Sequence, residues 1–309
     1  MGMNPQHTVM RRKLTTRVAG TVAAIWRFPV KSMQGEELSE SHVGTAGLVG
    51  DRAYAILDQE TGKVASATHP KLWPQLIACR ARFVESPRPG RDVPAIRIEL
   101  ADGTAVRSDA TDVDAVLSRF FGRPVALARA APKDFTVDQY HPDIENLDPE
   151  GHRDELLEQK LGAALLNELG MSWPLPEGSF LDLAPVSVIT SSTLDHLGAL
   201  QPDCTFDVRR FRMNVIVDTT EPGFVENDWL DRILHIGEEV RLSVAMPDPR
   251  CVMTTVAQPG LPQDPAILKS LVKHNRLDIA GWGLYPCAGV YATVAFPGTI
   301  RAGAAVMAV

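Results

Sequence analysis

The chain has few cysteines and no long apolar segment, and both shortages limit what it can be. Its 309 residues include four cysteines, which are widely spaced and form no C-x-x-C pair: Cys79, Cys204, Cys251 and Cys287. This pattern fits neither a disulfide scaffold nor a cysteine-rich zinc site, so we expect reduced thiols and a cytoplasmic location. No stretch approaches the roughly 18 uncharged apolar residues that a membrane-spanning helix needs, so no membrane span is expected.

Two common ligand classes also lack support in the sequence. The net charge is −7 and no basic stripe runs along the chain, which argues against nucleic acid as a partner. The sequence has no Walker A loop and no G-x-G-x-x-G segment after a strand pattern, so nucleotide binding is not indicated. A chain of this length is expected to form two domains or one elaborated domain.

Short strand patterns separated by turn residues predict a mostly β fold with some α/β elements. From residue 20 to residue 130, strand patterns alternate with turns such as Ala101–Gly103, which indicates an antiparallel, barrel-like domain. A short helix is predicted over Thr111–Gly122, because this segment begins with a cap residue and ends in glycine. A second β-barrel domain with peripheral helices is predicted over residues 180–309.

The other two segments are predicted as a leader and a connector. Residues 1–19 are basic, and the apolar run that follows is broken by Gly20 and Arg27, so we interpret them as a disordered leader and not as a signal peptide. Residues 131–179 are rich in proline and charge. Their one amphipathic stretch, Asp154–Leu169, predicts a linker with a covering helix.

Three basic segments lie where predicted strands end in turns: Phe28–Ser32, Val49–Arg52 and Arg209–Asn214. Lys31 offers a point charge and Ser32 a hydroxyl group, whereas Arg52 and Arg212 offer planar forks that suit a phosphate. Taken singly, each segment is more simply explained as a surface charge beside a turn. Together they are able to hold one phosphorylated ligand.

Cys251 directly follows Arg250 and is the candidate for the chemistry of this chain. The neighbouring positive charge is expected to favour the thiolate, which is the better nucleophile and the better ligand for soft metals. A free cysteine more often packs as a small hydrophobic side chain, and this is also the simpler explanation of Cys287. His69 is a further polar candidate, without an assigned acid or base role.

The order and spacing of several segments resemble the MOSC family, in particular its two-domain, amidoxime-reducing members. The matching segments are Pro29-Val-Lys-Ser32, Gly50-Asp-Arg52, Arg210-Phe-Arg-x-Asn214, Trp229, Arg250-Cys251-x-x-Thr-Thr255 and Pro297-Gly298. The resemblance implies an N-terminal MOSC β-barrel domain, a C-terminal MOSC domain, and molybdenum cofactor held between them. It also implies a family-level association with pyridoxal phosphate.

The resemblance further implies residue roles. Cys251 would be the catalytic residue and the protein ligand of molybdenum. The residues implied to bind the cofactor are Lys31, Ser32, Arg52, Thr190, Ser191, Arg212, Asn214 and Arg250. Thr190 and Ser191 have an alternative explanation, because a Ser or Thr at the start of a helix is commonly a cap.

The implied activity is reduction of a small N-hydroxylated substrate. Electrons would come from a separate ferredoxin-, flavin- or cytochrome b5-type protein. The alternative is a non-redox carrier, which would transport molybdenum cofactor or sulfur as a persulfide on Cys251. A third interpretation, an interaction scaffold, leaves the basic segments without a shared ligand.

Overall fold

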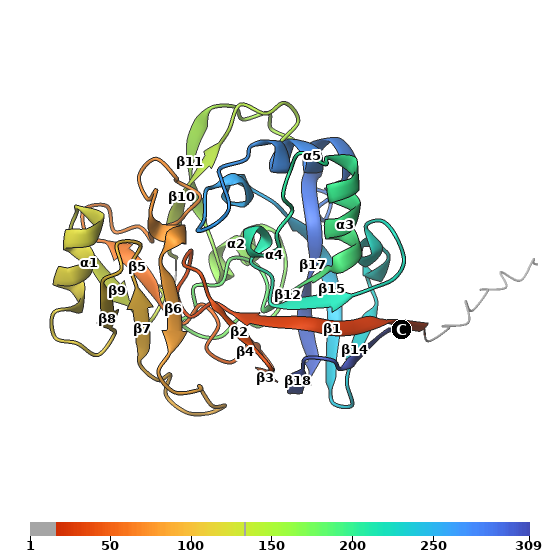
Figure 1. Cartoon of the computed structure of the whole chain (residues 1–309), viewed down its shortest axis with the longest axis horizontal. Helices are drawn as coiled ribbons and strands as arrows, with labels where there is room; N and C mark the ends of the chain where they lie inside the picture. The colour runs from red at the N-terminus through yellow and green to blue at the C-terminus, as the bar shows by residue number, and fades with distance from the viewer. Residues whose placement is uncertain (1–16, 133) are drawn as a thin grey trace, which may run out of the picture.

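The first strand of the described chain belongs to the same barrel as strands from its C-terminal end. In the computed structural model, which describes residues 17–132 and 134–309, β1 (Arg17–Arg27) pairs with β13 (Val215–Asp218) and with β19 (Ala305–Ala308). The barrel is completed by β14 (Ile233–Ile236), β15 (Val240–Pro249), β17 (Leu284–Phe296) and β12 (Val186–Thr190), in this order. Pairing of β12 with both β17 and β13 closes it. Figure 1 shows β1 extending between the blue elements, beside which it begins, and the orange ones.

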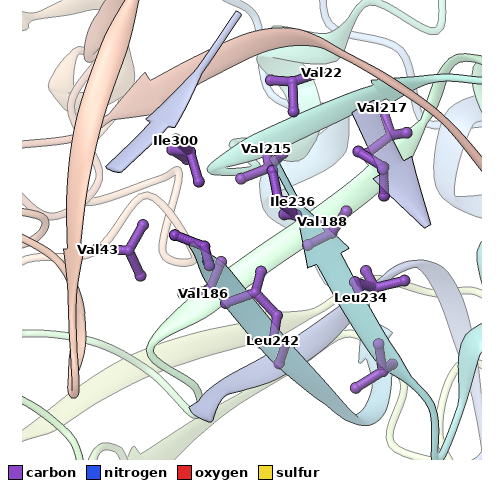
Figure 2. Close-up of a cluster of buried hydrophobic side chains, with 14 of the residues drawn as sticks. Val22, Val43, Val186, Val188, Val215, Val217, Leu234, Ile236, Leu242 and Ile300 are labelled. Atoms are coloured by element: carbon purple, nitrogen blue, oxygen red, sulfur yellow. The ribbon is translucent and has the colours of Figure 1, made fainter. Parts of the chain in front are cut away.

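Alternating side chains explain why β12 and β13 are buried on both faces. Val188, Val215 and Val217 belong to the barrel interior, where β-branched side chains pack well against a pleated surface (Figure 2). Ile189 and Ile216, one position along, belong to a second core. That core is formed with the helices α3 (Ser191–Leu200) and α5 (Ala266–His274). The predicted mostly β fold with peripheral helices is confirmed.

A separate N-terminal unit packs around its own core. It contains β5 (Ala55–Asp58), β9 (Val125–Ala128), β6 (Arg80–Phe83), β7 (Ile96–Glu99), β8 (Ala105–Arg107) and the helix α1 (Val113–Phe121). β5 pairs with β9, and β7 lies between β6 and β8. Leu117 of α1 is buried with Ile56 and Ile98. Gly122 ends α1 with φ of 67°, so the predicted helix and its glycine stop are confirmed.

Shorter elements complete the described structure. β2 (Glu36–Leu38) pairs with β1, β3 (Glu40–Gly44) pairs with β4 (Gly47–Leu48) and β18 (Gly298–Arg301), and β16 (Arg276–Asp278) pairs with β17. The short helices are α4 (Val208–Phe211) and the 3-10 turns η1 (Leu76–Ala78), η2 (Val225–Trp229) and η3 (Val252–Thr255). None of the helices in the described ranges has the length and apolar character needed to cross a membrane.

The helix predicted over Asp154–Leu169 is wrong for most of its length. β10 (Thr136–His141) and β11 (Glu155–Lys160) form an antiparallel hairpin, and helix follows only as α2 (Ala163–Glu168). Helical spacing of leucines is a local signal, and pairing with β10, a strand that the sequence analysis did not predict, overrides it. Figure 1 shows the hairpin above the two units.

The predicted domain boundaries stay predictions. The pairing of β1 adds that the barrel takes strands from both ends of the described chain. Residues 1–16 of the predicted leader lie outside the described residues.

Candidate functional site

A cavity of about 200 Å³ lies where the N-terminal unit, the barrel and the β10–β11 hairpin meet. The structure brings most of the predicted site residues to its lining: Lys31, Ser32, Arg52, Arg212, Asn214, Arg250 and Cys251. Lys31 and Arg52 both lie between β1 and β5, whereas Arg212 follows α4 and Cys251 lies just after β15. Segments about 200 residues apart in sequence therefore form one site.

Cys251 occupies the position before the first turn of η3. Its backbone is extended, and its carbonyl accepts hydrogen bonds from the amide and the hydroxyl of Thr254, at 3.2 and 3.0 Å. Burial raises the pKa of the Cys251 thiol, and the attraction of Arg250 offsets this only in part. Arg250 thus acts on the thiol in the expected direction, but burial outweighs its effect.

Arg250 is held by other partners. Its Nη1 donates to Asp248 Oδ2 at 2.6 Å and its Nη2 donates to the carbonyl of Phe211 at 2.6 Å. The buried Nε has no hydrogen-bond partner within residues 17–132 and 134–309. A buried donor without a partner is costly, so this N–H is available to a ligand in the cavity.

Two arginines share one aromatic ring beside the cavity. The guanidinium carbons of Arg52 and Arg212 lie 4.5 and 4.3 Å from the centre of the Phe28 ring, within cation–π range. Arg52 Nη2 donates to the carbonyl of Arg212 at 3.0 Å, and Arg212 Nη1 donates to the carbonyl of Met33. Burial, with repulsion from Arg52, lowers the pKa of Arg212 to about 9.

Lys31 adds a third buried cation. Its Nζ pairs with Asp182 and lies 3.4 Å from the carbonyl oxygen of Phe180. Burial lowers the pKa of Lys31, the pairing with Asp182 raises it, and repulsion from Arg52 and Arg212 lowers it further. Cations that depress one another's pKa would each be stabilised by an anion placed between them.

Three residues at the cavity have the left-handed backbone conformation that usually favours glycine. φ is 62° at Ser32, 48° at Arg52 and 55° at Arg212. Such a conformation costs on the order of 1–3 kcal/mol at a residue with a side chain, and it persists where the surrounding structure holds it. Strain at these positions is typical of a site built for binding.

Two family matches cover most of the chain. Residues 19–123 match the MOSC N-terminal beta barrel domain, and residues 177–307 match the MOSC domain. The chain belongs to the MOSC family. Among its relatives are mitochondrial amidoxime reducing component 2 of Rattus norvegicus, 25% identical, and component 1 of Homo sapiens, 24% identical. Each alignment covers 95% of this chain and 84% of the relative.

A solved structure is also similar to this MOSC protein. The YuaD protein of Bacillus subtilis aligns with a TM-score of 0.42 at 9% sequence identity, over 95% of this chain and 97% of YuaD. The named relatives are mitochondrial proteins, so the expected cytoplasmic location is not supported. Neither the family descriptions nor these names support an association with pyridoxal phosphate.

Thr190 and Ser191 are not part of the lining of the cavity in this MOSC protein. Thr190 precedes α3, where its Oγ1 accepts the amide of Thr193 at 3.1 Å and donates to the buried Glu226 at 2.6 Å. Ser191 Oγ donates to Asp218 at 2.8 Å. The structure thus places Thr190 as a helix cap, the alternative explanation that the sequence left open.

Asn214 lines the cavity, yet its amide is fully used within the MOSC fold. Its Oδ1 accepts from the amide and the hydroxyl of Ser187, at 3.1 and 3.0 Å. Its Nδ2 donates to the carbonyl of Trp26 at 3.2 Å and to Asp51 Oδ2 at 3.0 Å. Both donors and both lone pairs are satisfied, so Asn214 positions the wall of the cavity.

Sequence reasoning missed several residues of the site. Asp182 was detectable as the single acidic residue within the apolar run Phe180–Ala184, because a charge in such a run needs a partner. The hairpin residues, including Tyr140 and His141, gave no signal, since their segment was interpreted as a linker. Cys287 is fully buried with an ordinary packing role, and His69 is absent from the lining of the cavity.

Proposed function

We propose that this protein binds molybdenum cofactor and reduces N-hydroxylated compounds, with Cys251 as the protein ligand of molybdenum. Membership of the MOSC family and the amidoxime-reducing relatives support a molybdenum-cofactor-associated protein. The observation that carries the finer proposal is the meeting of Cys251 with Lys31, Arg52 and Arg212 at one cavity.

The chemistry of these residues fits the cofactor. Cys251 provides a soft sulfur donor, which suits a metal already bound by the sulfurs of a dithiolene. Lys31, Arg52 and Arg212 provide a buried cationic group for the phosphate of the pterin. Burial and mutual repulsion lower the pKa values of Lys31 and Arg212, so an anion bound between them would stabilise their charged forms. The buried Nε of Arg250 supplies a further donor.

The reaction consumes two electrons and two protons, breaks the N–O bond and releases water. Bound molybdenum would supply the two-electron redox change. Tyr285 and Tyr291 line the cavity, and burial raises the pKa of both phenols, so they keep their protons at neutral pH and would be donors toward a bound ligand. Electrons would come from a separate ferredoxin-, flavin- or cytochrome b5-type protein.

The test begins with protein purified from a host that makes the cofactor. Molybdenum content is measured first, and reduction of benzamidoxime is then assayed with an artificial electron donor. We expect one molybdenum per chain and turnover, and loss of both in Cys251→Ala. Cys204→Ala is the matched control, because Cys204 lies outside the cavity, and it is expected to retain both properties.

The other outcomes separate the alternatives. Stoichiometric molybdenum without turnover of any N-hydroxylated compound would favour the non-redox carrier. Protein without molybdenum under these conditions would contradict both the enzyme and the cofactor carrier.

A further inference from the structure

Three side chains with metal-binding groups meet where the β10–β11 hairpin turns. His141 is the last residue of β10, and Asp148 and His152 lie in the loop that leads to β11. One ligand atom of each residue lies within 4.8 Å of the others. His141 and Asp148 also line the cavity, so the cluster forms part of its wall. None of these residues belongs to the cationic group of the proposed cofactor site.

The spacing of the cluster matches the edges of a metal coordination shell. His141 Nδ1 lies 3.0 Å from Asp148 Oδ2, and His152 Nδ1 lies 3.3 Å from Asp148 Oδ1. Four ligands at zinc distances of about 2.0–2.1 Å form a tetrahedron whose edges are about 3.3 Å. Each histidine therefore places its Nδ1 close to the zinc edge length from one oxygen of the Asp148 carboxylate, His141 from Oδ2 and His152 from Oδ1.

The carboxylate of Asp148 is oriented. Its Oδ1 accepts the backbone amides of Glu150 at 2.9 Å and Gly151 at 2.7 Å, which leaves Oδ2 beside His141. An oriented carboxylate is a suitable metal ligand.

Both imidazoles have a polar partner on the side away from Asp148. His152 Nε2 lies 3.4 Å from Glu150 Oε2, and His141 Nε2 lies 3.3 Å from the side-chain amide of Gln139. A metal-bound histidine commonly donates its other ring N–H to such an outer group, and the amide of Gln139 accepts this hydrogen when it is turned over. The side chains are also shielded, with exposed fractions of 14% for His141, 5% for Asp148 and 25% for His152.

We propose that His141, Asp148 and His152 bind a zinc-type divalent cation, which fixes the hairpin loop as a wall of the cavity. Two imidazole nitrogens favour zinc over magnesium or calcium, which prefer oxygen ligands. Three protein ligands leave a fourth position for water. This zinc site is independent of the proposed molybdenum site, because Cys251 is not one of its ligands.

Zinc titration of tag-free, full-length protein tests the proposal after treatment with a chelator. We expect one equivalent of zinc to bind to the wild type and to Cys251→Ala, and magnesium not to compete. His152→Ala should weaken binding by more than the roughly 10–100-fold that loss of an outer partner costs, and Glu150→Gln should fall within that range. His42→Ala, in β3, is the control and should bind as the wild type does.

Several results would overturn the proposal. Zinc affinity that is unchanged in both His152→Ala and Asp148→Asn, with folding verified by circular dichroism, would show that the cluster is not the site. Loss of zinc in Cys251→Ala would assign the metal to the thiol. Absence of zinc binding to the wild type would show that the two histidines form only hydrogen bonds to Asp148.

Discussion

The cavity has two walls that are held in different ways. One, the cation wall, consists of Lys31, Ser32, Arg52 and Arg212. The side chains of its three cations bond to residues more than 100 positions away in the chain. The other, the hairpin wall, is the loop of residues 141–154 between β10 and β11. Its hydrogen bonds are mainly local, such as that from Tyr140 to Asp154 at 2.6 Å.

This difference indicates that the two walls depend on bound ligands to different degrees. The cation wall is strained and buried, and it is part of the packing between the N-terminal unit and the barrel, so it is formed before any ligand binds. The hairpin wall is held mainly by hydrogen bonds within its own loop, and a bound cation would add ligand bonds to them. Substitutions in the two walls should therefore affect different properties, and they should change stability by different amounts.

Asp51→Ala is expected to have the largest effect on stability. Its buried carboxylate accepts the amide of Phe28 at 2.8 Å and the Nδ2 of Asn214 at 3.0 Å, and it pairs with Arg52. Removing one partner of a buried ion pair costs about 3–5 kcal/mol of unfolding free energy. Urea denaturation of metal-free protein measures this, and Asp148→Ala in the hairpin wall should cost about 1–3 kcal/mol. Equal losses would refute the contrast between the walls.

Arg212→Gln and His152→Ala are expected to separate the two ligands. The buried guanidinium of Arg212 contributes charge-assisted binding worth about 1.5–3 kcal/mol, so its loss should lower cofactor affinity roughly 10- to 100-fold. Zinc affinity should remain unchanged in Arg212→Gln. His152→Ala should show the opposite pattern, with zinc lost and molybdenum content retained. Metal analysis of both variants would expose any dependence of one site on the other.

Gly283→Ala tests whether the packing of Pro149 against Gly283 holds the hairpin wall in place. Gly283 has φ of 110°, and an added Cβ would lie 2.5 Å from Cγ of Pro149 in the hairpin loop. Gly281→Ala is the matched control, since φ is 84° there and an added Cβ meets nothing within 4 Å. Both variants should lose about 1–3 kcal/mol through backbone strain. Only Gly283→Ala should also weaken zinc binding. Equal zinc affinities of the two variants would show that the packing of Pro149 against Gly283 does not affect the zinc site.

The contrast between local and long-range interactions also explains which features could be predicted from the sequence. The helix α1 carries a local signal, a glycine stop, and it was predicted from that signal. Lys31, Arg52, Arg212 and Cys251 were assigned to one site because a family pattern relates distant segments, and all four line one cavity. Site residues that depend on tertiary neighbours gave weaker signals or none.

Three features illustrate that limit. The positive φ of Arg52 and the stacking of two arginines on Phe28 exist only once the units have packed. The pKa of Cys251 rises because burial outweighs a charge that is adjacent in sequence. The hairpin strand β11 has helical spacing of its leucines, so only the presence of β10 decides its conformation.

Lys31→Met is expected to have the smallest effect, and to increase stability. Burial lowers the pKa of Lys31 below 10.5, despite the opposing attraction of Asp182. At neutral pH the lysine is charged in both states, and its burial lowers the free energy of unfolding by the full amount. Between the lowered pKa and 10.5 the unfolded chain binds more protons than the folded one, so this destabilisation disappears as the pH rises toward 10.5. Methionine removes that contribution and should stabilise the protein by about 1 kcal/mol at pH 7.

The gain from Lys31→Met should shrink as the pH is raised from 7 to 10, which denaturation at both values measures. The half-exposed Asp182 remains solvated when its partner is removed, so it should not cancel the effect. Molybdenum content should fall in the same variant, because the lost charge is one that the proposed phosphate site requires. A variant that is more stable and binds less cofactor would show that the cation wall is maintained for binding, at the expense of stability. A destabilised Lys31→Met protein at pH 7 would instead assign Lys31 a structural role.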